Sequence, residues 1–275
     1  MISAGAFGEG FSMLIIGDEH WYGEFQLPDP HRRVATGHYG GVTGWPRLIG
    51  EEALPAMLWY NDDRTCSTVG GSFTIEHVKY SGDTLKAIDL SFVQHCEAGA
   101  PALHGQIHWH DADETVPPGP VQPIPASVWA PAPGAVPASG TVVYLTSDPG
   151  DPILDGATLT YTPAEASIHA SASATGVRVS MDTGTSWDFR FEVMSSIPAP
   201  AAGYYAGVRR TPDHNPAKGG LNVSGAGRSC NALTGWFAIE QIGYTAGVLT
   251  SLTLRFEQHC EAAAAALRGY VRWTG

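Results

Sequence analysis

Three histidines, His104, His108 and His110, lie close together in the first half of the chain, and the differences between their positions are even. Alternate residues of a β-strand project from the same face, so on a strand these imidazoles would share one side. Imidazole binds zinc and copper, and such a site would suit a metal-dependent enzyme. A solvent-facing polar strand is the competing interpretation, which we favour because outer strand faces are ordinarily polar.

A second polar pair, His95 and Glu97, recurs in the second half of the chain as His259 and Glu261. Residues two apart share a strand face, and the spacing permits a charge-assisted hydrogen bond. No serine or cysteine in an evident activating motif accompanies either pair. We therefore expect these side chains to orient a neighbouring loop rather than to catalyse a reaction.

Three aspartates, Asp148, Asp151 and Asp155, fall within the short segment SDPGDPILDG and could in principle bind calcium. Their spacing does not match the alternating ligand pattern of an EF-hand loop. Aspartate and glycine are also the residues that tight turns prefer. We favour a turn without a bound ion.

Aromatic residues offer a different kind of site. Trp45, Trp59 and Tyr60 lie in a stretch that we expect to be irregular, and Tyr204 and Tyr205 form a pair in the second half. An exposed ring can stack on a sugar or on a partner protein. Packing of the same rings onto their own domain is the alternative, because an exposed tryptophan is costly.

An internal repeat indicates the elements that carry these residues. Residues 64–109 match residues 228–273 without a gap, 164 positions apart, and 20 of the 46 aligned pairs are identical. The match continues upstream at an offset of 166, which aligns Trp21 with Trp187. Residues aligned in this way are called equivalent below. Two similar copies predict two modules with the same fold.

Alternation of apolar and polar residues predicts half-buried strands at 88–96 and 103–109, and both patterns recur in the second copy. Arg268 is equivalent to His104, so the fold does not require histidine there.

The four cysteines are placed alike in the two copies, and we expect two disulfides, Cys66–Cys96 and Cys230–Cys260. Each would close a loop of the same length and stabilise its module by about 3 to 4 kcal/mol. Structural zinc is the competing use of four cysteines, but no C-x-x-C pair occurs.

Composition divides the chain into three segments. Residues 111–140 contain eight prolines, a density that favours an extended spacer over a sheet or helix. The predicted domains are a β-sandwich module at 1–110, this proline-rich linker and a second β-sandwich module at 141–275. We expect an all-β protein of two tandem antiparallel sandwiches.

The second module is predicted to contain a hairpin that the first lacks. Residues 141–163 indicate two strands around an Asp-Pro-Gly turn, and Met1 aligns near Ser167. A sandwich without these strands exposes backbone donors and acceptors along a sheet edge. We expect the second module or a neighbouring chain to cover that edge, and the latter would give self-association.

Three stretches carry a resemblance to known sequences: YLTSDPGDPILDGATLTY at 144–161, GLNVSGAGRSCNALTGWFAIEQIGY at 220–244 and FEQHCEAAAAALRGYVRW at 256–273. They resemble a β repeat module of predicted secreted or surface proteins of environmental bacteria. The resemblance implies an exported module with a Cys–Cys bridge and no established activity. The first copy departs from it at residues 51–55, where Glu-Glu-Ala-Leu-Pro replaces a loop rich in proline and glycine.

Charge and hydropathy exclude some classes of partner. The formal net charge is −12, and no long basic cluster is present, so nucleic acid is not expected as a partner. No apolar run is long enough to span a bilayer, and no signal peptide is visible at the start. The disulfides nevertheless favour a secreted or cell-surface protein.

These observations leave three functions. We favour a non-catalytic binding or adhesion protein that presents aromatic residues to a glycan or to a cell-surface or matrix component, because tandem modules gain avidity. A structural repeat of an extracellular matrix or filament is the first alternative. A metal-dependent enzyme built on the three histidines of the first module is the second. No cofactor is expected, although zinc, copper and calcium are the ions to consider.

Overall fold

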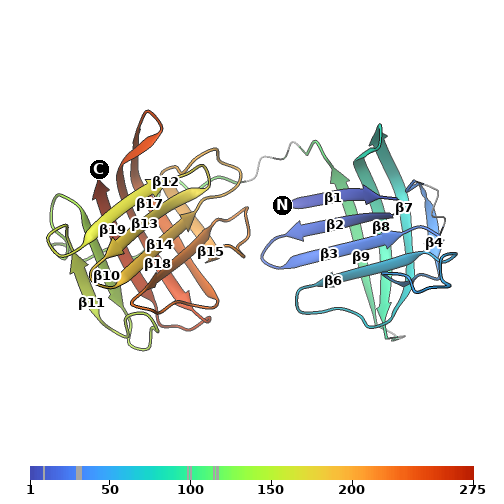
Figure 1. Cartoon of the computed structure of the whole chain (residues 1–275), viewed down its shortest axis with the longest axis horizontal. Coiled ribbons are helices and arrows are strands. Elements are labelled where there is room, and N and C mark those ends of the chain that lie inside the picture. Colours follow the sequence, from blue (N-terminus) through green and yellow to red (C-terminus); the bar gives the residue numbers. More distant parts are fainter. Residues whose placement is uncertain (9, 29–32, 98, 100, 114, 116–117) are drawn as a thin grey trace. The chain divides into compact units, whose positions relative to one another are not determined.

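The computed structural model is all-β, as predicted, and no described residue lies in a helix (Figure 1). It describes residues 1–8, 10–28, 33–97, 99, 101–113, 115 and 118–275. The chain forms two compact units, Met1–Thr115 and Val116–Gly275. A helix long and apolar enough to cross a membrane is not found in the described part of the chain.

Two mostly antiparallel sheets face each other in the first unit and give it a sandwich-like fold (Figure 1). The first sheet has the strand order β1 (Ile2–Phe7), β2 (Gly10–Ile16), β3 (His20–Gln26), β6 (Ala56–Asn61) and β5 (Thr43–Gly44). The second sheet has the order β4 (Gly37–Gly40), β7 (Val69–Ser81), β8 (Thr84–Cys96) and β9 (Ala102–His110).

The second unit is built from one ten-stranded sheet that curls around its core, so that β12 lies against β18 and β19. One half has the order β11 (Thr158–Tyr161), β10 (Val142–Ser147), β19 (Leu267–Thr274), β18 (Val248–Cys260), β17 (Leu233–Thr245) and β15 (Gly203–Arg210). The other half continues as β16 (Gly220–Gly225), β14 (Ser186–Glu192), β13 (Gly176–Asp182) and β12 (Ser167–Ala172).

Equivalent phenylalanines form the centre of each core. In the first unit Phe25 meets Phe73 edge-on, with ring centroids 5.4 Å apart, and lies 5.8 Å from Phe92. In the second unit the ring of Phe191 lies 5.4 Å from that of Phe237, the equivalent of Phe73, and 5.6 Å from that of Phe256, the equivalent of Phe92. Side chains on alternate positions of these strands therefore point outward, which defines the outer face of each sheet.

Strand pairing also recurs at the offset found in the sequence. Phe73 of β7 is opposite Phe92 of β8, and Phe237 of β17 is opposite Phe256 of β18. The register shifts at equivalent positions in the two pairs of strands, after Ile75 in β7 and after Ile239 in β17. A register slip of one residue would turn every side chain of a strand to the other face of the sheet. Because the register is the same in both units, equivalent residues lie on the same face and can be compared directly.

Both predicted disulfides are confirmed, Cys66–Cys96 and Cys230–Cys260. The predicted hairpin of the second copy is also present, with β10 at 142–147 paired to β19 and β11 completing the hairpin.

The proline-rich segment differs from the predicted spacer. Its described residues from 118 onward pack on the second unit, where Val121 forms a β-bridge with Tyr204. Arg255 donates to the carbonyls of Val128 and Trp129 at 3.0 and 2.7 Å, and Arg272 donates to that of Pro137 at 2.7 Å. Proline-rich chain leaves its carbonyls free to accept such bonds. We call residues 118–140 the strap.

Candidate functional site

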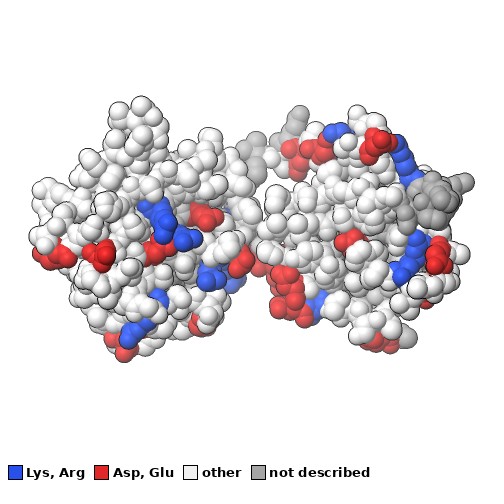
Figure 2. Space-filling model, in the orientation of Figure 1, with Lys and Arg blue, Asp and Glu red and all other residues white. Residues whose placement is uncertain are grey.

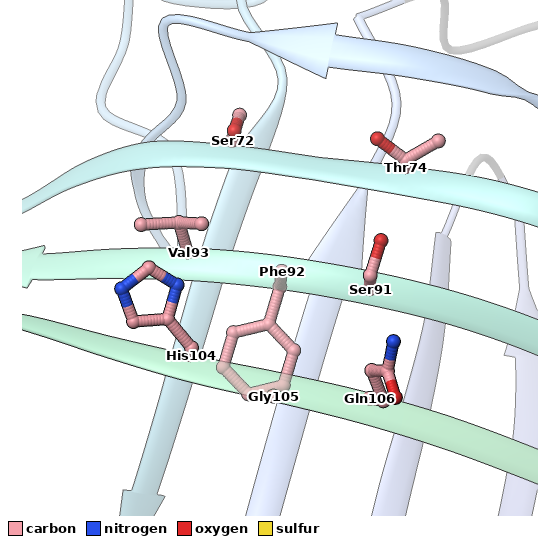
Figure 3. A pocket seen from close by; sticks show the side chains of 8 residues that line it. All are labelled: Ser72, Thr74, Ser91, Phe92, Val93, His104, Gly105 and Gln106. Carbon is pink, nitrogen blue, oxygen red and sulfur yellow. The ribbon is translucent and has the colours of Figure 1, made fainter.

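The outer face of the β4–β7–β8–β9 sheet is hollowed into a shallow site of about 440 Å³ (Figure 3). Strand alternation sends Phe92 into the core and leaves small polar side chains outside. The outward lining consists of two residues from each of three neighbouring strands: Ser72 and Thr74 of β7, Ser91 and Val93 of β8, and His104 and Gln106 of β9.

Part of this lining is already hydrogen-bonded within the unit. The Thr74 hydroxyl lies 2.9 Å from Nδ1 of His38, and the Ser91 hydroxyl donates to Oε1 of Glu76 at 2.7 Å. Within the described residues, the side chains of Ser72, His104 and Gln106 form no hydrogen bond. A hydroxyl, an imidazole and an amide therefore remain available to a ligand, each able to donate and accept.

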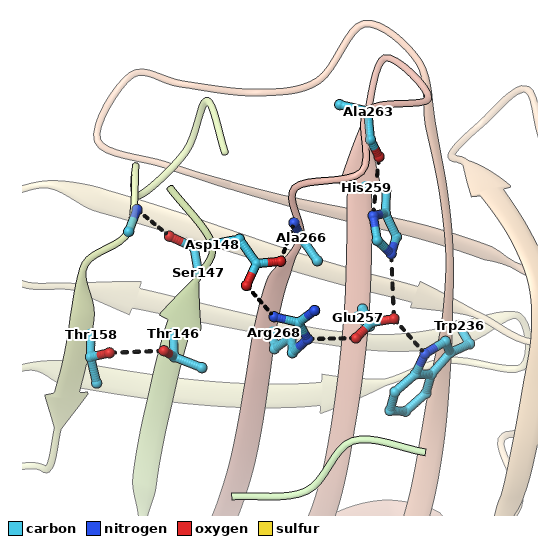
Figure 4. Close-up of polar contacts among 11 residues, drawn as sticks. Thr146, Ser147, Asp148, Thr158, Trp236, Glu257, His259, Ala263, Ala266 and Arg268 are labelled. Carbon is cyan, nitrogen blue, oxygen red and sulfur yellow. Dashed lines mark hydrogen bonds and ion pairs between the residues drawn. The ribbon is translucent and has the colours of Figure 1, made fainter. Parts of the chain in front are cut away.

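The equivalent face of the second unit is filled by an ionic network (Figure 4). Arg268, equivalent to His104, donates through Nε to Oε2 of Glu257 at 2.6 Å and through Nη1 to Oδ1 of Asp148 at 2.8 Å. Trp236, equivalent to Ser72, donates to Oε1 of Glu257 at 3.3 Å. Large charged and aromatic side chains thus occupy the space that is open in the first unit.

Arg268 sets the protonation of this network. Burial alone would raise the pKa of Glu257, but the hydrogen bond and charge of Arg268 outweigh it and hold that pKa below its usual value. The hydrogen bond from Arg268 is the main reason that the pKa of Asp148 is also lowered. Both carboxylates therefore remain ionised at neutral pH.

The strap covers more of the same face of the second unit. Besides its bonds to Arg255, its Trp129 stacks on Tyr144 of β10 with ring centroids 6.4 Å apart. Ser91, equivalent to Arg255, is too short to hold such a segment. The two units therefore present the same sheet face in two states, open in the first and covered in the second.

The three histidines do not converge. His104 lines the hollow, whereas Nδ1 of His108 lies 3.2 Å from Oδ1 of Asp89, and His110 lies near Asp113. Residues two apart on a strand are separated by about 7 Å, so the ends of this row are far apart. No group of three or more His, Cys, Asp or Glu side chains that could hold a metal occurs among the described residues.

The three aspartates of the β10–β11 connection are bound to backbone amides and to Arg268. Oδ2 of Asp151 accepts from the amides of Ile153 and Leu154 at 3.2 and 2.7 Å, and Oδ1 of Asp155 accepts from Gly150 at 3.0 Å. Burial raises the pKa of Asp151. These contacts are those of the predicted turn.

The predicted aromatic site is corrected in two respects. Trp59 and Tyr60 lie on strand β6 rather than in an irregular stretch. Tyr205 is fully buried, its hydroxyl donates to the Ala201 carbonyl at 2.7 Å, and burial raises its pKa to about 12. Because it belongs to the core, Tyr205 cannot contact a ligand.

The remaining aromatic candidates are half-buried and do not form one surface. Trp59 faces the core side, where its ring lies 5.1 Å from that of Phe92. Tyr60 faces outward on the other sheet and stacks on Tyr22 at 4.9 Å. The ring centroids of Tyr204 and Trp236 are 5.7 Å apart, and Trp45 lies in a bend directly after β5.

The pair His95 and Glu97 orients loops, as expected. Oε1 of Glu97 accepts from the amides of Ser67 and Thr68 in the loop after Cys66, and Nδ1 of His95 lies 3.1 Å from the Gly99 carbonyl.

Sequence reasoning identified His104 but missed Ser72, Ser91 and Gln106. Ser91 and Gln106 occupy polar positions of the two predicted strands, whereas Ser72 lies on β7, which was not predicted. The available signal was the replacement of these residues by Trp236, Arg255 and Tyr270 in the other copy. Comparisons with protein-family models, with curated proteins and with solved structures found no match.

Proposed function

We propose that the protein is a non-catalytic extracellular binding protein whose ligand site is the hollow on the outer face of the first unit. The observation that carries this proposal is the contrast between equivalent faces. Hydroxyl, amide and imidazole groups line an open hollow in the first unit, whereas Arg268, Glu257 and the strap fill that place in the second. We attribute the similarity of the two units to duplication of one module.

The lining favours a neutral, hydroxyl-rich ligand such as a glycan chain of a cell surface or matrix. Hydroxyl, amide and imidazole groups exchange hydrogen bonds with sugar hydroxyls, and Val93 offers a small apolar contact. The hollow contains no lysine or arginine to pair with an anion. Figure 2 shows the other side of the first unit, over β1, β2, β3 and β6, where acidic and basic side chains are scattered.

The extracellular location is supported by the two disulfides, because such bonds persist in oxidising compartments. It also fits the resemblance to exported modules described above.

The test is a screen of the full-length protein against an array of neutral glycans, followed by titration of the bound glycan. Ser72→Trp, Val93→Glu and His104→Arg together give the hollow the residues of the second unit, and we expect the Kd to rise by about tenfold or more. Tyr60→Ala, on the other sheet, is the matched control and should leave the Kd unchanged. Binding that survives the triple substitution, or the absence of any bound glycan, would contradict the proposal.

A further inference from the structure

The strand β9 ends its sheet in the first unit. Its equivalent, β19, pairs on that same side with β10 of the hairpin. Among the described residues, no strand pairs with the outer edge of β9. Unpaired backbone groups along such an edge are a template for another strand.

Apolar groups beside β9 are more exposed than their equivalents beside β19, where the hairpin covers them. Leu103 of β9 is 41% exposed, whereas its equivalent Leu267 is 0% exposed beside the hairpin. The disulfides differ in exposure in the same way, since Cys96 is exposed and its equivalent Cys260 is buried. The first unit thus leaves open a surface that the second unit buries.

A cavity lies beside this edge. It measures about 500 Å³, and its lining is mainly apolar. Trp21, Trp59, Arg64, the Cys66–Cys96 bridge, Ala102 and Leu103 contribute to it. An aliphatic side chain entering here would displace water from aromatic rings and sulfur, which is favourable.

The second unit shows what fills the equivalent place. There the β10–β11 connection folds over the sheet, so that Ile153 is buried and its carbonyl accepts from Arg228 at 3.3 Å. The amide of Asp148, in the same connection, donates to the carbonyl of Ala266 at 2.9 Å. Arg64 and Ala102, which are equivalent to Arg228 and Ala266, both line the cavity of the first unit.

We propose that β9 and this cavity form an acceptor site for an extended segment of another protein chain. The segment pairs antiparallel with β9, places an aliphatic side chain opposite Gly105, then turns and inserts a second aliphatic side chain between the tryptophans and the disulfide. Residues 142–153 are the template, since Leu145 is opposite Gly269 in β19 and Ile153 is the inserted side chain. Main-chain bonds would give affinity, and the cavity would give specificity.

The probe is a synthetic peptide of residues 141–157, added to the full-length protein. In the same molecule β19 is already paired with its own tethered hairpin, which competes at high effective concentration, so the peptide finds only β9 open. We expect amide hydrogen exchange to slow across residues 102–110 and to stay unchanged across residues 267–274.

Two variants and one altered peptide complete the test. Leu103→Asp should raise the Kd of the peptide by about tenfold or more, as should Ile153→Asp in the peptide, because each places a carboxylate in the apolar contact. Ile49→Asp, at a fully exposed aliphatic residue elsewhere in the first unit, is the matched control and should have no effect. Dimers that form without peptide and disappear with Leu103→Asp would identify a second copy of this chain as the donor.

The proposal would be overturned if residues 102–110 gained no protection at about 1 mM peptide. It would equally be overturned if a scrambled peptide bound as well as the native one.

Discussion

At the scale of single residues, one buried amide in each unit joins strands that face each other across the core. Gln94 of β8 is 3% exposed and accepts from the backbone amide of Trp59 on β6 at 2.7 Å while donating to its carbonyl at 2.9 Å. Gln258 makes the same two bonds with Val223 at 2.8 and 3.0 Å. The side-chain amide of glutamine thus satisfies the backbone N–H and C=O of one residue, as a neighbouring strand would.

Replacing Gln94 by leucine should lower the free energy of unfolding of the first unit by about 1 to 3 kcal/mol, because the amide and carbonyl of Trp59, which are largely shielded from water, lose their partner. Calorimetric unfolding measures the change. Gln106→Leu is the matched control on the outer face and should cost less than about 1 kcal/mol. Equal losses in the two variants would show that the buried bonds contribute little.

The sequence predicted the alternation that buries Gln94, but it did not predict that Trp59 is the partner of its two hydrogen bonds. Period-two patterning tells which side of a strand a residue occupies, and says nothing of which distant backbone it meets. Hence His104 and the cysteines were identified, while Ser72 and Gln106 needed the fold to bring β7 and β9 to either side of β8.

At the scale of elements, β6 lies where the sequence predicted an irregular stretch. Its residues Met57, Leu58, Trp59 and Tyr60 form a continuous apolar run, so no alternation marks it. Met57 and Trp59 face the core, and Tyr60 is half covered on the outside by Tyr22. A strand covered on both faces resembles any other apolar segment in a single sequence.

The attachment of the β10–β11 hairpin to β19 should depend on pH through Asp148 and Glu257. Both have pKa values lowered in the folded state, so their stabilising effect is present above the unfolded values of 3.8 and 4.5 and is lost as the pH falls through the lower folded values. We expect the Tm of the second unit to fall between about pH 5 and pH 3.

In Arg268→Met that dependence should be weaker, because the cation that lowers both pKa values is removed. Calorimetry across this pH range measures it. Lys86→Met, which removes an ion pair to Asp111 in the first unit, is the control and should leave the second unit's pH profile unchanged. A variant profile as steep as that of the wild type would contradict the role of Arg268.

At the scale of the whole molecule, two units share strand order, core and disulfide but differ in what covers one sheet. The second unit carries a hairpin and a strap, and its sheet face is filled. Among its described residues the first carries neither, and there both its outer face and the edge of β9 are open. Proline density predicted an extended spacer, whereas the described residues 118–140 dock on the second unit through Arg255 and Arg272, which follow them by more than a hundred residues.

Releasing the strap should be measurable without disrupting either core. Arg255→Met removes the donor to the carbonyls of Val128 and Trp129, and we expect faster amide hydrogen exchange and proteolysis within residues 118–140. Arg178→Met, which removes an exposed ion pair to Asp188 on another strand of the same unit, is the matched control. An unchanged digestion pattern in Arg255→Met would show that other contacts hold the strap.

Backbone amide NMR shifts, recorded during titration with a neutral glycan selected from the array, locate the ligand on the protein. If the first unit's outer sheet face is the ligand site, the shifts should gather at Ser72, Ser91, His104 and Gln106, while the equivalent positions of the second unit stay unchanged. Shifts centred instead on Tyr22 and Tyr60, or on the second unit, would contradict it.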